Sequence, residues 1–195
     1  YDVVLDRTAF YPEGGGQPGD TGTLSGVRVT DTHERGGEIV HYCDAPLTPG
    51  AAVHGALDWE RRFDLMQQHS GEHLLSGIVH RRFGYDNVGF HMGADWITID
   101  FSGVLTPEEL RAVEQEANAA IWRDIPAEIT HPDAETLKTI PYRSKKELTG
   151  DVRIVTFPGV DICACCGTHV THTGEIGLVK IFSCEKFHEG VRLEL

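Results

Sequence analysis

The sequence has no hydrophobic run long enough to cross a membrane. A membrane-spanning helix needs about 20 consecutive apolar residues, and every apolar stretch in these 195 residues is far shorter. The chain also opens without the charged, apolar and small-residue segments of a secretory leader. We therefore expect a soluble, cytoplasmic protein that makes no membrane contact. A hydrophobic content of 40% suffices for one sizeable core or two small domains.

Basic residues are also scarce. The chain has 17 Lys and Arg against 30 Asp and Glu, which gives a net charge of −13. Proteins that hold nucleic acid through general electrostatics need clustered Lys and Arg, so any nucleic-acid partner must be met locally. Two basic clusters are candidates for such a contact, with solvated helix faces and loops as the alternative. They are Arg61-Arg62 with Arg81-Arg82, and Arg143 with Lys145-Lys146.

The cysteine pattern of a secreted, disulfide-bonded domain is missing too. The count of 5 is odd, and Cys163, Cys165 and Cys166 are crowded too tightly for such a framework. Crowded thiols favour a reducing compartment and metal binding. Cys43 and Cys184 stand apart, and we expect both to be small buried residues.

Both ends of the chain have strand-like patterns. The first residue is Tyr1 rather than Met, and residues 1–5 and 191–195 alternate as strands do. We expect more protein beyond the ends, with room for a further domain.

The composition changes once, after residue 58. Residues 1–58 lack helical periodicity, and glycine and proline turns separate alternating stretches at 26–32 and 38–43. This pattern predicts a small β-barrel domain. Residues 59–195 mix helical and strand patterns and predict an α+β domain, with helices packed on a mainly antiparallel sheet.

Helical signals are clearest in two places. An apolar stripe runs from residue 59 to Gly84, a plausible C-terminal cap, with Ser70 or Gly71 as an open candidate for a break. Thr106, Pro107 and Glu109 predict the capped start of a helix that reaches residue 123. The other expected elements are strands at 96–101, 127–130 and 152–157, a short helix at 134–139, and a closing hairpin of 176–183 and 190–195.

Two short motifs supply metal-binding side chains. His69 and His73 are four residues apart, which on a helix places both imidazoles on one face, one turn apart. Cys165 and His169 have the same spacing. Zinc accepts neutral imidazole nitrogen and thiolate sulfur in tetrahedral geometry. The four side chains therefore predict a zinc site, although a chain with 11 His and 5 Cys also produces such pairs by chance.

The four ligands leave the role of the metal open. Zinc with four protein ligands and no water is typical of a structural site. Zinc with one ligand loosened, or with a fifth position opened, holds a substrate or activates water. The sequence is compatible with both.

A glycine-rich segment, residues 11–20, lies in the first expected domain. Gly14, Gly15 and Gly16 permit positive φ and close backbone approach, so the loop is able to admit an RNA backbone or another domain. No Gly-Lys-Ser/Thr follows, so the segment does not match a phosphate-binding loop. A tight turn is the alternative.

Three blocks of sequence together resemble one family. They are residues 5–20, the His69 to His73 pair, and Cys165 to His169 followed by residues 173–177. In this order they resemble the editing domain of alanyl-tRNA synthetases and the free-standing AlaX-type editing proteins. The resemblance implies a glycine-rich β-barrel domain followed by the α+β domain shared by alanyl- and threonyl-tRNA synthetases.

The resemblance also implies a reaction and a site. The reaction is zinc-dependent hydrolysis of mischarged tRNA(Ala), chiefly Ser-tRNA(Ala) and sometimes Gly-tRNA(Ala), at the acceptor end of the tRNA. The implied zinc ligands are His69, His73, Cys165 and His169. The implied substrate-binding residues are Gly14, Gly15, Gly16, Gln17 and Thr168.

The chain departs from the family pattern at three positions. Relatives usually carry Gly where Cys166 stands, and we favour Cys165 as the ligand because it keeps the four-residue spacing to His169. Glu72 stands where synthetase relatives commonly carry Thr, and His91 lies where relatives place polar substrate contacts. We take Glu72 and His91 as the catalytic candidates.

Glu72 has several roles open to it. Its carboxylate is able to act as a general base, to orient a ligand imidazole, or to hydrogen-bond the seryl group. On a helix, however, it points about 100° away from its neighbour His73. Two other functions remain compatible with the chain, namely a zinc hydrolase of a small molecule and a non-catalytic, zinc-stabilised RNA-binding domain of a larger synthetase-like protein.

Overall fold

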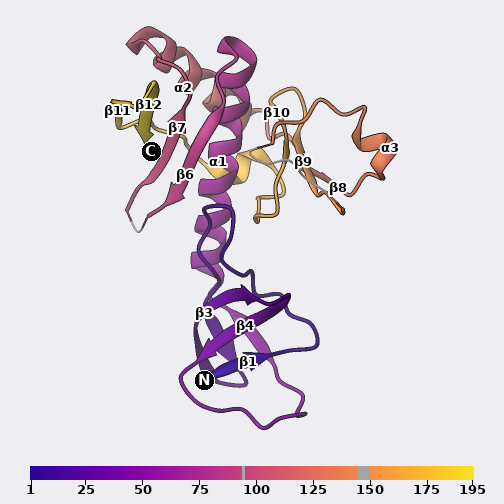
Figure 1. The fold of residues 1–195 in the computed structure, drawn as a ribbon. Coiled ribbons are helices and arrows are strands. Elements are labelled where there is room, and N and C mark those ends of the chain that lie inside the picture. Colours follow the sequence, from indigo (N-terminus) through magenta and orange to yellow (C-terminus); the bar gives the residue numbers. More distant parts are fainter. Residues whose placement is uncertain (94, 145–149) are drawn as a thin grey trace. The chain divides into compact units, whose positions relative to one another are not determined.

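A computed structural model of the protein describes residues 1–93, 95–144 and 150–195 (Figure 1). The chain divides into two compact units, Tyr1–Leu65 and Met66–Leu195. The division after residue 58 that the composition suggests stays a prediction. Among the described residues, none of the helices is both long and apolar enough to span a membrane.

The first unit is built on one antiparallel sheet of five strands in the order β1-β4-β3-β2-β5. Its strands are β1 (Asp2–Val4), β2 (Gly22–Leu24), β3 (Val27–Arg35), β4 (Glu38–Cys43) and β5 (Gly55–Leu57). Phe10, Leu24, Val29 and Cys43 form its buried core, so the expectation for Cys43 is confirmed. The predicted barrel is not confirmed. Strands β1 and β5 are the two edges of the sheet, and within the fully described residues 1–65 no strand pairing joins them.

The glycine-rich segment forms a tight turn. The amides and carbonyls of Gly14 and Gln17 exchange two hydrogen bonds of 3.0 Å each. Between them Gly15 and Gly16 have φ of 61° and 87°, which L-residues with a side chain rarely adopt. Gln17 is fully buried. The turn therefore needs glycine for its backbone conformation.

Two arginines of the first basic cluster, Arg61 and Arg62, make contacts inside the first unit. Arg62 Nε donates to both oxygens of the buried Asp20 carboxylate, at 2.9 and 3.0 Å. Arg61 donates to the carbonyl of Gly19 at 2.8 Å. Both guanidinium groups thus hold the segment that follows the glycine turn.

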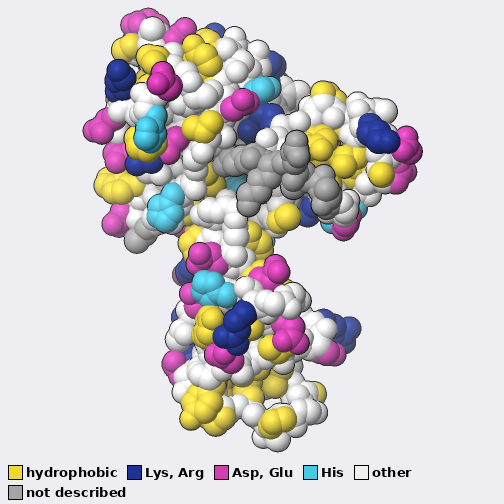
Figure 2. All heavy atoms as spheres, viewed as in Figure 1, with side chains coloured by type: hydrophobic (Ala, Val, Ile, Leu, Met, Phe, Trp, Pro, Cys, Tyr) yellow, Lys and Arg dark blue, Asp and Glu magenta, His cyan; other side chains and the backbone are white. Residues whose placement is uncertain are grey.

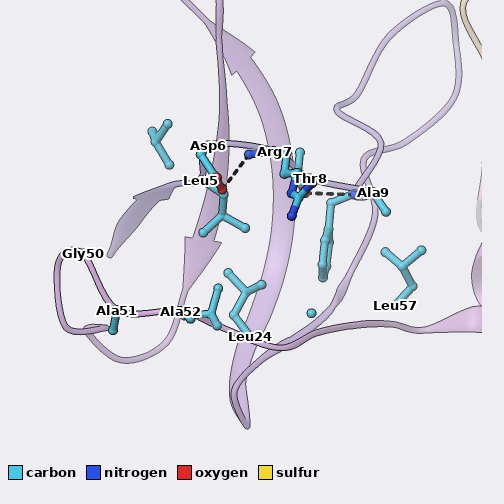
Figure 3. Close-up of a pocket in the computed structure, with 14 residues that line it drawn as sticks. Leu5, Asp6, Arg7, Thr8, Ala9, Leu24, Gly50, Ala51, Ala52 and Leu57 are labelled. Carbon is cyan, nitrogen blue, oxygen red and sulfur yellow. Dashed lines mark hydrogen bonds between the residues drawn. The ribbon is translucent and has the colours of Figure 1, made fainter.

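A cavity of about 640 Å³ opens in the first unit (Figure 3). Apolar residues such as Phe10, Leu24 and Leu57 line part of it, and polar atoms contribute a similar share of its walls. Asp6 and Arg7 are its charged residues, and Asp6 accepts a hydrogen bond from the Arg7 amide at 2.9 Å.

Helix α1 (Trp59–Phe83) carries the first histidine motif and runs without a break through Ser70 and Gly71. It ends at Phe83 and is followed by Gly84, whose φ is 71° and whose amide donates to the His80 carbonyl at 2.8 Å. Residues 69–79 are buried on every side of the helix. The helix lies between two antiparallel sheets of the second unit in Figure 1.

The two sheets have the strand orders β11-β12-β7-β6 and β10-β9-β8. The strands are β6 (Asn87–Met92), β7 (Ile97–Phe101), β8 (Glu128–Thr130), β9 (Ile154–Phe157), β10 (Asp161–Ala164), β11 (Ser183–Phe187) and β12 (Gly190–Glu194). The helical elements besides α1 are α2 (Pro107–Trp122), α3 (Ala134–Leu137) and the 3-10 turn η1 (Thr173–Ile176). Helices with mainly antiparallel sheets confirm the predicted α+β class.

The predicted start of α2 is confirmed. Thr106 Oγ1 accepts a hydrogen bond from the Glu109 amide at 3.3 Å, and Glu109 accepts one from the Thr106 amide at 2.7 Å. Each group satisfies a donor that the helix end leaves open.

The closing hairpin is shifted from its predicted place. Its first strand is Ser183–Phe187, whereas residues 176–183 were predicted. Thr173, Ile176 and Val179 are buried at intervals of three, as side chains of a turn packed on the core, rather than alternating as a strand does. Cys184 lies on the hairpin and is exposed, so the prediction of a buried residue there is wrong.

Candidate metal centre

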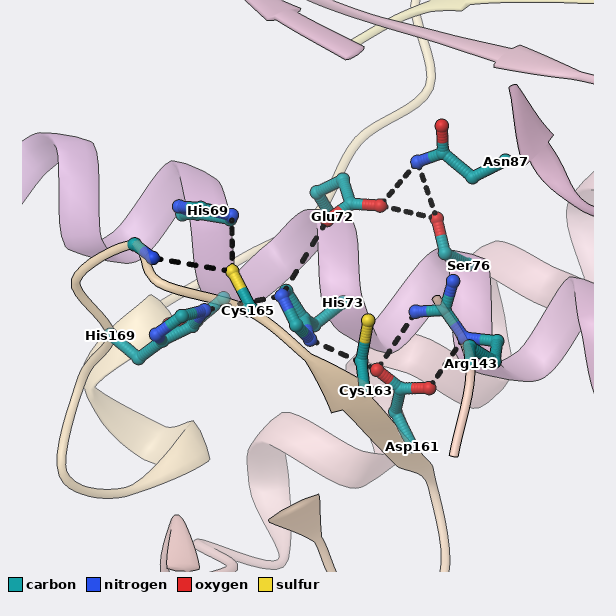
Figure 4. A network of polar contacts seen from close by, with 12 residues as sticks. His69, Glu72, His73, Ser76, Asn87, Arg143, Asp161, Cys163, Cys165 and His169 are labelled. Carbon is teal, nitrogen blue, oxygen red and sulfur yellow. Dashed lines mark hydrogen bonds and ion pairs between the residues drawn. The ribbon is translucent and has the colours of Figure 1, made fainter. Parts of the chain in front are cut away.

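Four potential metal ligands converge inside the second unit (Figure 4). His69 and His73 project from one face of α1, and Cys165 and His169 come from the loop after β10. Cys165 Sγ lies 3.4 Å from His69 Nε2, and His169 Nε2 lies 3.1 Å from His73 Nε2. One donor atom from each residue falls within 4.8 Å of all the others. The three imidazoles are buried and Cys165 is half-buried.

The donor separations fit a tetrahedral zinc ion. Bonds of zinc to nitrogen and sulfur of ordinary length place neighbouring ligand atoms about 3.3–3.6 Å apart. The distances of 3.4 Å between Cys165 Sγ and His69 Nε2 and of 3.1 Å between the Nε2 atoms of His169 and His73 are close to this spacing. Imidazole and thiolate are also the ligand types that zinc prefers. The cluster therefore fits the metal in donor type and in separation.

The loop is held so that Cys165 faces the imidazoles. Arg153 donates to the carbonyls of Cys165 and Gly167, at 2.7 and 3.0 Å. The Gly167 amide in turn lies 3.4 Å from Cys165 Sγ and donates to it. Cys166 is exposed and lies outside the cluster. The geometry therefore brings Cys165, and not Cys166, to the three imidazoles.

Electrostatics keep the thiol ionised and one imidazole neutral. Burial opposes ionisation of Cys165, but hydrogen bonds from the three imidazoles outweigh it and hold its pKa far below that of an ordinary thiol. Burial lowers the pKa of His169 to about 3. A thiolate and a neutral imidazole are the forms in which these side chains bind metal.

His73 is tied to a buried ion pair on its other side. Its Nδ1 lies 2.9 Å from Asp161 Oδ2, and Arg143 donates to both oxygens of Asp161, at 2.7 and 2.8 Å. Burial favours the neutral acid, but the hydrogen bonds from His73 and Arg143 outweigh it and lower the pKa of Asp161 to about 2. Burial also opposes the charge on His73, yet Asp161 and Cys165 raise its pKa well above the ordinary value.

A second group of potential ligands overlaps the first. His73, Asp161 and Cys163 are close enough to share an ion. Arg143, however, already places a guanidinium charge on both oxygens of Asp161. Burial raises the pKa of Cys163 to about 11, so its thiol stays protonated. A cation is therefore disfavoured at this second group.

Glu72 borders the donor cluster. Its side chain is buried, and its Oε2 lies 3.9 Å from His73 Nε2. Ser76, one turn further along α1, donates to Glu72 Oε1 at 2.6 Å, and Asn87 Nδ2 donates both to the same oxygen and to Ser76 Oγ. The carboxylate therefore reaches back toward His73 from its own position on the helix.

Comparison with known proteins gives the sequence context of this cluster. Residues 152–193 match the family model of the threonyl and alanyl tRNA synthetase second additional domain, and residues 1–61 match that of class II (A) tRNA synthetases. The chain is 37% identical over 190 residues to the alanyl-tRNA editing protein Aarsd1 of Mus musculus, covering 95% of this chain and 46% of that protein. It is 38% identical over 191 residues to the alanyl-tRNA editing protein AlaX-L of Pyrococcus horikoshii, covering 92% and 47%.

The chain is similar to alanyl-tRNA editing proteins along most of its length. It spans about half the length of the two editing proteins. It is also 40% identical over 202 residues to the alanine–tRNA ligase of Ignicoccus hospitalis, covering 97% of this chain and 22% of that enzyme. The resemblance predicted from the three sequence blocks is therefore confirmed.

The residues expected to contact substrate are divided between the two units. Thr168 is half-buried in the loop between Cys165 and His169. Gly14, Gly15, Gly16 and Gln17 form the turn of the first unit. His91 is exposed on β6, next to Phe90, whose ring lies 5.3 Å from that of His69. Neighbouring side chains of a strand point to opposite faces, so His91 is directed away from the donor cluster.

The other described arginines of the two expected basic clusters form ion pairs. Arg81 and Arg82 both pair with Glu116, and Arg143 pairs with Asp161. Lys145 and Lys146 lie outside the described residues. The described arginines of the two expected basic clusters therefore serve internal contacts.

Sequence reasoning missed the partners of the motif residues. Ser76 carries a usable signal, since its four-residue distance from Glu72 places both on one helix face. Asp161, Arg153 and Asn87 reach the site from other elements, and their spacing along the chain gives no such signal.

Proposed function

We propose that this chain hydrolyses the ester bond that joins an amino acid to the terminal ribose of mischarged tRNA(Ala). Ser-tRNA(Ala) is the main proposed substrate and Gly-tRNA(Ala) the second, drawn from the cytoplasmic pool of aminoacyl-tRNA. The observation that carries the proposal is the buried cluster of His69, His73, Cys165 and His169 with the Glu72 carboxylate beside it. Similarity to alanyl-tRNA editing proteins supports the choice of tRNA.

Zinc is the proposed cofactor, with these four side chains as its ligands. When bound there it would supply a Lewis acid that polarises the ester carbonyl or lowers the pKa of a water molecule. The chain itself contributes the negative and neutral donors and excludes bulk water from three of them by burial. The donor types and their spacing support zinc over Mg²⁺ or Ca²⁺, which prefer oxygen ligands.

Glu72 is the proposed general base. In this step its carboxylate takes a proton from the attacking water, the water oxygen bonds to the ester carbon, and the bond from that carbon to the ribose oxygen breaks. The proton then passes to the ribose oxygen, which leaves as a hydroxyl. Ser76 and Asn87 support this role because their hydrogen bonds fix the carboxylate next to the donor cluster. Since His91 faces away, we assign no catalytic role to it.

The proposed contact with tRNA is confined to its acceptor end. Acidic side chains are spread over the visible face of each unit in Figure 2, and the described arginines of the expected clusters are paired internally. Such a surface supports local recognition rather than a grip on the whole tRNA. Thr168, beside the ligand His169, is a proposed substrate contact, as are Gly14, Gly15, Gly16 and Gln17 of the glycine turn.

A non-catalytic, zinc-stabilised RNA-binding module is the second candidate function. The observation that favours it is the number of protein donors, because four ligands are typical of structural zinc. A structural site predicts tRNA binding without release of the amino acid.

A deacylation assay of the purified, zinc-loaded protein distinguishes the two functions. We expect the protein to release serine from Ser-tRNA(Ala) and glycine from Gly-tRNA(Ala), and to leave Ala-tRNA(Ala) and Thr-tRNA(Thr) largely intact. The comparison of serine with alanine rests on the seryl hydroxyl, because a polar site that hydrogen-bonds this group rejects alanine more strongly than a size filter does. Binding of all four without release of any amino acid would establish the second candidate instead.

A further inference from the structure

Among the described residues, Asp161 is the hydrogen-bond partner of the His73 Nδ1 atom. The distance from Nδ1 to Asp161 Oδ2 is 2.9 Å, and each side chain is only 1% exposed. A carboxylate accepts, so Nδ1 carries the proton. Nε2 is thereby the nitrogen presented to the cluster, where His169 Nε2 lies 3.1 Å away.

Asp161 is itself fixed in place. Arg143 donates from Nε to Oδ1 at 2.7 Å and from a terminal nitrogen to Oδ2 at 2.8 Å, in the bidentate geometry that guanidinium groups favour. The backbone of Asp161 pairs with Phe157 across the β9–β10 ladder. At Gly77 of α1, an added Cβ would lie 2.6 Å from Asp161 Cβ. Helix and strand therefore approach closely at this point, which leaves the carboxylate little freedom.

The histidines of the cluster are not anchored alike. His169 is buried, and among the described residues its Nδ1 has no hydrogen-bond partner. His73 by contrast has a charged acceptor that is held by a second charge. Histidine ligands of metals commonly donate their other ring nitrogen to such a carboxylate, which fixes the tautomer and raises the basicity of the ligating nitrogen.

We propose that Asp161, held by Arg143, is a positioning residue that fixes the tautomer and orientation of His73 and thereby sets the metal affinity of the cluster. The inference rests on the proposed function, because it takes the four donors to be a metal site. The alternative role for Asp161 is purely structural, as half of a buried ion pair that joins β10 to the rest of the unit.

The direct test is the affinity of the full chain for Zn²⁺, measured by competition with a chromophoric chelator in the absence of tRNA. We expect Asp161→Asn to weaken Zn²⁺ binding about 10- to 100-fold. Asp86→Asn is the matched control, since Asp86 lies 3.0 Å from Nδ1 of His80 on the same helix but is exposed and belongs to neither ligand group. That variant should bind Zn²⁺ as the unaltered chain does.

Asp161→Asn leaves Arg143 without its ion-pair partner, which on its own destabilises the fold. The double variant Asp161→Asn with Arg143→Met removes both charges and keeps the test valid if the single variant does not fold. Nitrogen NMR of the imidazoles in the zinc-loaded chain gives a readout that a structural role would not move. The Nδ1–H signal of His73 should be protected from exchange in the unaltered chain and lose that protection in the variants.

Wild-type affinity for Zn²⁺ in a folded variant that lacks the Asp161 carboxylate, single or double, would overturn the inference. An equal loss in Asp86→Asn would overturn it as well, because the effect would then not belong to His73. Tight Zn²⁺ binding that depends on Asp161, in a chain that deacylates no tRNA, would support the inference and contradict only the proposed reaction.

Discussion

The Glu72 carboxylate lies 3.9 Å from Nε2 of His73, although the two residues are neighbours on one helix. Adjacent side chains of a helix diverge by about 100°, so this approach needs support from other residues. Ser76 and Asn87 give that support through hydrogen bonds to the carboxylate. A negative group is thus held beside the donor cluster, which a packing role for Glu72 would not require.

Glu72→Gln should slow deacylation of Ser-tRNA(Ala) about 100- to 10,000-fold, the usual contribution of a general base. The amide keeps the shape and most of the hydrogen bonds but no longer accepts a proton. Zinc content should be unchanged, because Glu72 is not one of the four clustered donors. Glu60→Gln, in the first turn of the same helix, is the control. Single-turnover rates measure the effect, and an unchanged rate in Glu72→Gln would exclude general-base catalysis by this residue.

Ser76→Ala should lower the free energy of unfolding by about 1–3 kcal/mol, because it removes a hydrogen bond to a buried carboxylate. Urea denaturation monitored by circular dichroism measures the change. Ser183→Ala is the matched control, since Ser183 donates to Glu194 at 2.8 Å on a partly exposed hairpin. The free energy of unfolding of Ser183→Ala should fall by no more than about 0.5 kcal/mol. Equal losses in the two variants would contradict the strong role given to the buried network.

Cys165→Ala should reduce both bound zinc and deacylation, whereas Cys166→Ala should retain both. The reason is that Cys165 Sγ lies 3.4 Å from His69 Nε2 while Cys166 is exposed. Metal analysis of the purified variants gives the zinc content per chain. Loss of zinc from Cys166→Ala and its retention in Cys165→Ala would reverse the assignment.

Removal of zinc by a chelator should lower the thermal stability of the second unit. A ligand present at about 1,000 times its Kd stabilises the folded state by about 4 kcal/mol. The effect should shrink as the pH is lowered, since protons compete with the metal for His73, whose pKa is raised well above the ordinary value. Thermal unfolding with and without EDTA at two pH values measures both effects. A chelator effect that grows as the pH is lowered would contradict metal binding by these ligands.

Local signals in the sequence predicted the parts of the molecule that depend on neighbours along the chain. The spacing of His69 and His73 and the capping box at Thr106 are of this kind, and the structure has the expected helices there. The position of the first hairpin strand was predicted wrongly, and the barrel was not confirmed. Burial at Ile176 and Val179, and pairing at the sheet edges, are decided by tertiary contacts.

The candidate site shows the same limit. The four donors could be found from two pairs at one helical spacing, but their partners come from β6, β10 and the segment before β9. Asp161 meets His73 across 88 positions of sequence, and Asn87 meets Glu72 across 15. Only folding brings such residues together, so the second layer of contacts around the donors has no signature in a single sequence.

The most direct measurement is the release of serine from Ser-tRNA(Ala) by the zinc-loaded chain beside its His73→Ala variant, with zinc content determined on the same samples. We expect release by the loaded chain, and loss of both zinc and release in the variant. Full release by a metal-free His73→Ala protein would contradict this expectation.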